Sequence, residues 1–136
     1  IVYKKVDEVL SENSSDNYFF DDEFMYVREL LNKFTDKDWK LLTQDLKDKD
    51  DKYKIRLAYC IDEDAKMNGF NLLLDLINEN DEVVEYALDS LRSFDKEPYK
   101  NLIYSDKVVI KKAENLLKNA SLPVKKMLEV FLQQSK

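Results

Sequence analysis

Three stretches of this 136-residue chain repeat one pattern of residue types. Each begins with a small polar residue able to cap a helix, continues with a β-branched residue, and then carries Ala or Met and Leu. The stretches are residues 51–58, 81–88 and 121–128. Their β-branched residues Ile55, Val84 and Val124 lie 29 and 40 residues apart, within the range of stacked helical repeats. Because one such unit cannot bury its own apolar face, the repetition predicts a helical solenoid, an architecture that offers extended binding surfaces.

Residues that break helices are almost absent from the sequence. It contains one glycine and two prolines, whereas sheet proteins of this size spend many glycines and asparagines on turns. Hydrophobic residues make up 44% and charged residues 37% of the chain, a balance typical of a folded, helix-rich protein. We expect an all-α single domain over residues 1–136, large enough to bury a core.

Apolar residues at helical spacing predict about 8–9 short helices along the chain. After the first helix we expect a loop over residues 12–17, with Asp22 as the cap of the second helix. Thr35 and Asp38 form a capping-box pattern before the third. The run after Gly69 is so apolar that its helix is expected to be central. Short helices in this number suit an α-solenoid better than a four-helix bundle, which needs fewer and longer helices.

Acidic residues outnumber basic residues by 28 to 22, which gives a formal net charge of −6. This balance argues against nucleic acid as a partner, because phosphate binding requires clustered positive charge. An acidic surface suits a basic protein partner. It is also explained by solubility alone, so both interpretations stay open.

The single cysteine, Cys60, lies in an apolar helical run and has no cysteine to pair with inside the chain. We expect a small buried side chain in a protein of a reducing compartment. No apolar run approaches the length of a membrane span, and no signal peptide is recognisable. The expected location is therefore cytoplasmic, without membrane binding.

The residue types that usually carry catalysis are scarce. Histidine is absent, one cysteine cannot build a thiolate zinc site, and one glycine cannot make a phosphate-binding loop. The acidic runs 48–51 and 62–64 offer oxygen ligands but lack the spacing of a calcium loop. We therefore expect no enzyme activity, no metal and no cofactor.

The expected binding surface lies on the second helix of each hairpin, which lines the concave face of a solenoid. Arg56 is expected to be exposed there. The predicted partner-binding residues are Tyr59, Asp62, Glu63, Glu82, Glu85, Tyr86, Asp89, Arg92 and Asp95. Glu82, Glu85 and Asp89 share one helical stripe, where like charges repel by a few tenths of a kcal/mol per pair. Two interpretations of this stripe stay open: it binds a partner, or it is a solvated helix face. Tyr59 and Tyr86 point more clearly to binding, because tyrosines are frequent at binding hot spots.

Residues 39–46, 54–64 and 81–94 resemble HEAT-like repeats, with Asp81, Val84, Ala87 and Leu91 matching the pattern of the second helix. Glu85 stands where HEAT units usually carry Arg, which makes this face more acidic. More narrowly, the chain resembles the small helical immunity proteins encoded beside bacterial toxins of contact-dependent inhibition and related polymorphic toxin systems. The resemblance covers residues 36–134.

This resemblance implies a right-handed α-α superhelix of the HEAT/ARM type, with residues 1–34 as capping helices and 36–134 as helical hairpins. It also implies a cytoplasmic inhibitor that binds a cognate toxin domain, often a nuclease with a basic cleft. One alternative is an adaptor or scaffold that grips a peptide or a protein subunit. Another is a viral modulator that binds host helices in an apolar groove, which would require a long and almost entirely apolar central helix.

Overall fold

The computed structural model describes residues 1–135, and all regular structure in them is helical. Lys136, the last residue of the predicted domain, lies outside the described residues. The helices are α1 (Val2–Ser11), α2 (Asp16–Tyr18), α3 (Phe24–Leu31), α4 (Asp36–Leu46), α5 (Asp51–Cys60), α6 (Lys66–Leu76), α7 (Asp81–Leu91), α8 (Tyr99–Tyr104), α9 (Lys107–Leu117) and α10 (Leu122–Gln133). A π-helical turn, η1 (Phe19–Glu23), joins α2 to α3, and a 3₁₀ turn, η2 (Glu63–Ala65), precedes α6. The all-α prediction is confirmed.

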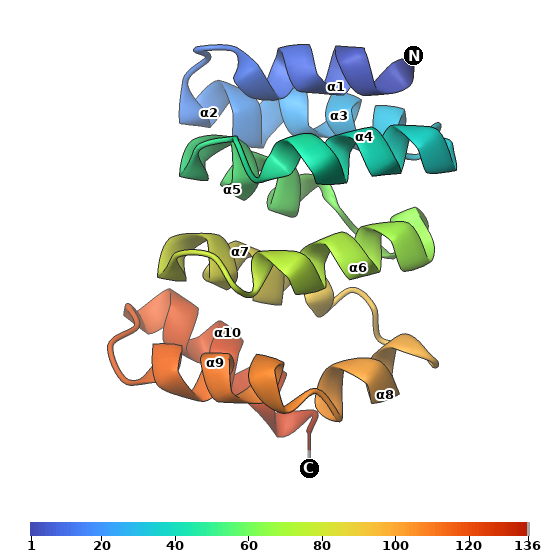
Figure 1. Ribbon diagram of the computed structural model, residues 1–136. Helices are drawn as coiled ribbons and strands as arrows, with labels where there is room; N and C mark the ends of the chain where they lie inside the picture. The colour runs from blue at the N-terminus through green and yellow to red at the C-terminus, as the bar shows by residue number, and fades with distance from the viewer. Residues whose placement is uncertain (136) are drawn as a thin grey trace.

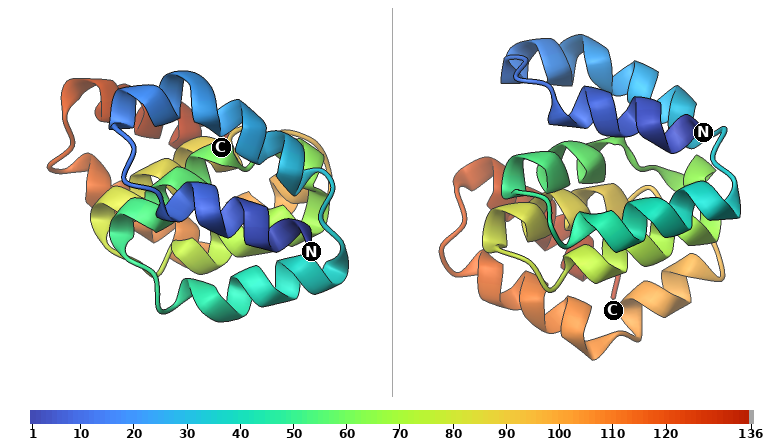
Figure 2. Two further views of the ribbon diagram at one scale, coloured as in Figure 1. Left: turned by 90° about the horizontal axis from the view of Figure 1, so that it is seen from above. Right: turned by 45° about the horizontal axis from the view of Figure 1, so that its top comes forward.

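The helices lie in two layers, and the chain passes from one layer to the other as it descends from the N-terminus to the C-terminus (Figure 1). In the first layer α1 packs on α4, and α4 packs on α6. In the second layer α3 packs on α5, α5 on α7, and α7 on α10. The right view in Figure 2 shows the same order, with α8 and α9 at the end opposite α1.

The core lies between these layers and follows the apolar stripes of the helices. Helix α6 is central as expected, and Leu73 within it is 0% exposed. Helix α7 buries Val83, Val84, Ala87, Leu88 and Leu91. Spacings of three and four residues place these five side chains on one face of the helix, so its polar residues occupy the other.

Asp22 does not cap a helix, contrary to the sequence prediction. The cap lies seven residues earlier, at Ser15, whose hydroxyl accepts a hydrogen bond from the backbone N–H of Tyr18 at 3.2 Å. The loop is therefore residues 12–15, and Asp22 lies inside the π turn η1. A π turn changes the helical register locally, so simple 3.6-residue periodicity misplaced this start.

The capping box at the start of α4 is confirmed. Thr35 Oγ1 accepts from the backbone N–H of Asp38 at 3.3 Å, and Asp38 Oδ2 accepts from the backbone N–H of Thr35 at 3.0 Å. Asp38 is also buried and accepts from the backbone N–H of Tyr3 at 3.1 Å. One carboxylate therefore caps α4 and ties α1 to it, which satisfies an N–H of the first turn of α1 that has no partner within its own helix.

Helix α6 begins at Lys66, three residues before Gly69, so the glycine lies inside the helix. A Cβ at Gly69 would lie 3.1 Å from Ile61 Cγ2 and 3.5 Å from Trp39 Cη2, and too close to Ala65 Cβ for two carbon atoms. The chain turns sharply just before this point, because Lys66 has φ +55° and ψ −148°. Gly69 is therefore required by close packing and does not act as a helix stop.

Candidate protein-binding face on α3, α5 and α7

Helices α5 and α7 lie side by side in the second layer and carry most of the predicted binding residues. Four of the nine are exposed: Glu82, Asp89, Arg92 and Asp95. The other five are half-buried: Tyr59, Asp62, Glu63, Glu85 and Tyr86. Glu85 is thus less accessible than a solvated helix face would make it.

Arg56 is not exposed, contrary to expectation; it is 1% accessible. Its guanidinium donates to Ser14 Oγ at 2.9 Å, to the Ser14 carbonyl at 2.9 Å and to Asp16 Oδ1 at 3.0 Å. It also lies over the Phe19 ring, 4.7 Å from the centroid. The loop before α2 folds over α5, and this tertiary contact buries a charge that helical spacing alone would leave in water. By fixing the loop, Arg56 positions the residues that follow it.

Four aromatic rings form a half-buried cluster on this face, which we call the aromatic cluster: Phe20, Phe24, Tyr59 and Tyr86. The Phe20 ring centroid lies 4.8 Å from that of Tyr59 and 6.0 Å from that of Tyr86, and the Phe24 and Tyr59 centroids lie 5.2 Å apart. The two tyrosine rings themselves are 6.4 Å apart. The cluster thus joins η1 and α3 to α5 and α7, and such pairs stabilise beyond the area they bury.

Sequence reasoning identified the two tyrosines but missed the two phenylalanines. Phe19 is fully buried in the core, whereas Phe20 is half-buried. Phe20 lies against Tyr59 and Tyr86, which are far from it in the sequence. No local signal therefore placed Phe20 beside α5.

Arg28 holds the end of α5 in place and was also missed. Its Nε donates to the Cys60 carbonyl and its Nη2 to the Tyr59 carbonyl, both at 3.1 Å. The same Nε lies 3.3 Å from Asp62 Oδ2, and the guanidinium lies 5.2 Å from the centroid of the Phe24 ring. A cation at the carbonyl end of a helix is favourable, and here it fixes Tyr59 and Asp62 relative to α3.

The carboxylates around the aromatic cluster make the face negative. Burial, reinforced by Glu82 and Asp81, raises the pKa of Glu85 above its usual value. Burial also raises the pKa of the Tyr86 hydroxyl, with Glu82, Asp16 and Glu85 adding to the effect. Burial is the largest cause of both pKa shifts, and the neighbouring carboxylates add to it.

Tyr86 lines two hollows. One, of about 500 Å³, is bordered by α2, α5 and α7 and lined among others by Asp16, Phe20 and Glu82. The other, of about 230 Å³, lies between α7 and α10 and includes Glu85 and Asp89 in its lining. A partner that covers Tyr86 would therefore meet concave surface next to it.

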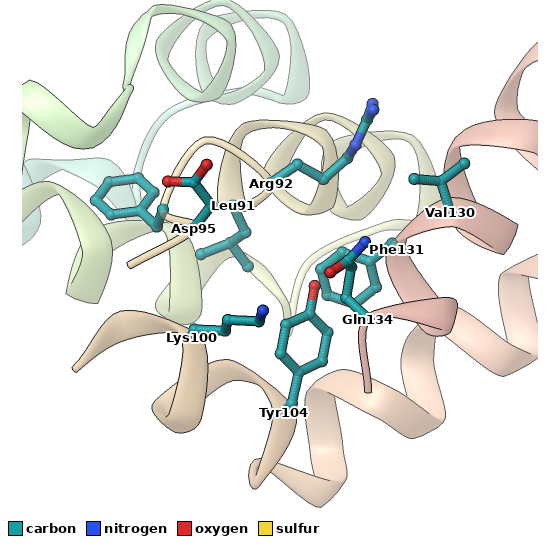
Figure 3. Close-up of a pocket in the computed structure, with 9 residues that line it drawn as sticks. Leu91, Arg92, Asp95, Lys100, Tyr104, Val130, Phe131 and Gln134 are labelled. Carbon is teal, nitrogen blue, oxygen red and sulfur yellow. The ribbon is translucent and has the colours of Figure 1, made fainter. Parts of the chain in front are cut away.

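Arg92 and Asp95 belong to a separate hollow of about 280 Å³ bordered by α7, α8 and α10 (Figure 3). There the amine of Lys100 and the hydroxyl of Tyr104 point inward, whereas Arg92 points away (Figure 3). Arg92 Nη1 instead lies 2.7 Å from Asp89 Oδ1. Arg92 therefore reaches back toward the acidic stripe, and Asp95 lines a different hollow from Glu82, Glu85 and Asp89.

The described residues hold no cluster of three or more His, Cys, Asp or Glu side chains placed to bind a metal ion. Cys60 is buried as expected, and burial raises the pKa of its thiol far above neutrality. Within residues 1–135 no helix has both the length and the apolar character to cross a bilayer.

Comparison with known proteins adds no relative: no family model, curated protein or solved structure matches the chain. The surface described above is therefore the basis for inferring function.

Proposed function

We propose that this protein is a non-catalytic immunity protein, which binds a cognate bacterial toxin domain in the cytoplasm and neutralises it. The toxin domain is basic, as a nuclease domain would be, and it contacts the face formed by α3, α5 and α7. One observation carries the proposal: four half-buried aromatic rings adjoin carboxylates of α2 and α7, namely Asp16, Glu82 and Glu85. The resemblance to immunity proteins supplies the identity of the partner.

The aromatic cluster has the chemistry of an interface centre. Tyr59 and Tyr86 combine a large apolar ring with a polar hydroxyl, and tyrosine is enriched among the residues that dominate binding energy. The four rings are held in fixed positions by each other, and Arg28 fixes Tyr59, so little conformational entropy remains to be lost on binding. Such pre-organisation favours tight association.

The surrounding carboxylates would act mainly on the rate of encounter. Glu82 and Asp89 are exposed, and Glu85 is half-buried between them on the same stripe. A negative face attracts a basic partner from a distance, and steering of this kind raises association rates by factors of about 10 to 1,000. The same charge repels nucleic acid, so a protein partner is favoured.

We further propose that the two helical layers are HEAT-like hairpins wound into a right-handed superhelix. In this arrangement residues 1–34 cap the stack, residues 36–134 form the hairpins, and α5 and α7 line its concave side. The side-by-side packing of α5 on α7 and of α7 on α10 supports this reading. An inward-curving wall would surround a protruding element of the toxin.

An adaptor that holds a peptide or another protein subunit is the second candidate. Three large side chains on the segment 16–31 are exposed: Tyr18, Met25 and Tyr26. They offer a further apolar contact area, which an adaptor with two partners would use.

A growth assay tests the immunity proposal directly. The product of the gene adjacent to its own is expressed in a bacterial host, with and without this protein. We expect growth arrest that the wild-type chain relieves. The variant Glu82→Lys/Asp89→Lys should relieve it less and should associate about tenfold more slowly with the purified toxin domain.

The matched control is Glu114→Lys/Glu129→Lys, which makes the same charge change at two exposed carboxylates on α9 and α10. The immunity proposal fails if the neighbouring product does not arrest growth or if the wild-type chain does not relieve the arrest. The role of the acidic face fails if both double variants protect equally well.

A further inference from the structure

The hollow between α7 and α10 has two chemically different walls. Pro123, Val124 and Met127 of α10 form an apolar wall, and Glu85 and Asp89 of α7 form an acidic one. Tyr86 of α7 also lines this hollow. At about 230 Å³ the hollow is smaller than the roughly 300–1,000 Å³ typical of small-molecule sites, so it suits one inserted side chain.

Such walls match a side chain with an apolar stem and a cationic end. Long basic residues place their methylene groups along apolar surface and keep the charge among polar groups. Met127 is well suited to the stem, because its unbranched thioether adapts to the shape of what it contacts. The Tyr86 ring can meet a guanidinium face to face, an arrangement that a planar cation favours.

Charge decides which occupant fits. The carboxylate of Glu85 forms no hydrogen bond or ion pair within residues 1–135, although the residue is half-buried. Burial and the neighbouring Glu82 and Asp81 raise its pKa, so its negative charge lacks compensation. An anion would be repelled here, and an apolar group would remove water from the carboxylate without replacing its hydrogen bonds. Of these three kinds of group, only a cation compensates the negative charge of Glu85.

We propose that this hollow receives an arginine side chain of a basic protein partner. Its guanidinium lies beside the carboxylates of Glu85 and Asp89, and its stem contacts Val124 and Met127. Asp89 is already paired with Arg92, so Glu85 is the principal partner of the guanidinium. Arginine is favoured over lysine because its planar fork can form two hydrogen bonds with one carboxylate and can stack on Tyr86. This inference rests on the proposed function, since it names the chemistry by which the same face recognises a basic toxin domain.

Titration of the full ¹⁵N-labelled chain with N-acetyl-L-arginine amide tests the hollow without a partner protein. We expect saturable shifts confined to the amides of residues 85–89 and 123–127. The uncharged isostere N-acetyl-L-citrulline amide should bind about tenfold more weakly, because it lacks the charge that Glu85 compensates. Glu85→Gln should cause a similar loss, and unchanged spectra elsewhere will show that it folds.

Glu129→Gln is the matched control, because Glu129 is exposed on α10 and outside the hollow. The proposal is overturned if citrulline amide binds as well as arginine amide, or if Glu85→Gln and Glu129→Gln behave alike. Shifts spread evenly over the acidic surface would overturn it too, since they would indicate general charge attraction.

The two proposals can fail separately. Arginine binding in the hollow together with a negative growth assay would keep the site and refute the immunity function. Growth rescue together with no arginine binding in the hollow would keep the function and refute this site.

Discussion

Replacing Gly69 by Ala should destabilise the protein, although the same change at an exposed helical site is stabilising. Alanine exceeds glycine in helix propensity by about 1 kcal/mol. At Gly69, however, the new methyl would collide with Ala65 Cβ and lie 3.1 Å from Ile61 Cγ2. Overpacking of this kind costs about 1–3 kcal/mol, so we expect a net loss of about 1 kcal/mol. For a domain of this size that lowers Tm by roughly 4 °C.

The collision has an identifiable origin. Cβ atoms four residues apart on a regular helix are about 5–6 Å from each other, so Ala65 and Gly69 would normally not touch. Lys66, which lies between them, has φ +55° and ψ −148° and therefore interrupts the regular helical spacing of Ala65 and Gly69. Ala65→Gly should therefore recover most of the loss in the double variant Ala65→Gly/Gly69→Ala, because it removes the other methyl group.

Urea unfolding followed by circular dichroism measures these differences. Asn71, exposed on the same helix, supplies the control: Asn71→Ala should be about 1 kcal/mol more stable than Asn71→Gly. If Gly69→Ala is as stabilising as this control, the close approach at Gly69 is wrong. If Ala65→Gly gives no recovery, the collision involves other atoms.

Three further changes follow from the same structure. Leu73→Ala should lower the free energy of unfolding by about 2–5 kcal/mol, because the side chain is fully buried; a loss below 1 kcal/mol in urea unfolding would contradict its central position. Lys66→Gly should raise the free energy of unfolding by about 1 kcal/mol, because glycine adopts the positive φ of residue 66 without strain. An unchanged or lower Tm would count against strain at Lys66. Burial opposes the charge of Asp38, yet hydrogen bonds from Thr35 and Tyr3 hold its pKa below the usual value. The stabilisation by the Asp38 carboxylate is therefore present above the unfolded pKa of about 3.9 and is lost as pH falls through the lower folded pKa. Asp38→Asn should lower the free energy of unfolding at pH 7 and flatten its decline below about pH 4. An acid unfolding transition unchanged from that of the wild type would refute this role of Asp38.

Much of the secondary structure could be predicted because the deciding interactions are local. The capping box of Thr35 and Asp38 joins residues three apart, and the apolar stripe of α7 repeats every three or four residues. Both signals can be read without knowing what packs against them. The start of the segment 16–31 was misjudged because the π turn η1 changes the register within it.

The candidate site was predicted only in part, for the opposite reason. Tyr59 and Tyr86 were found because they lie on the polar sides of amphipathic helices. Phe20 joins them only because η1 lies against α5 and α7, and Arg28 reaches the end of α5 from a position about thirty residues earlier. Contacts at such separations leave no periodic trace in one sequence.

By itself, the sequence determined that this protein is helical, acidic and poor in the groups that catalysis uses, because composition and local periodicity are enough for those properties. The tertiary structure decided which charges are buried and which rings meet. Arg56 and Glu82 both belong to helices of the second layer, yet one is enclosed by the loop before α2 and the other is exposed. What covers a side chain depends on how distant segments pack, and that packing is a property of the whole fold.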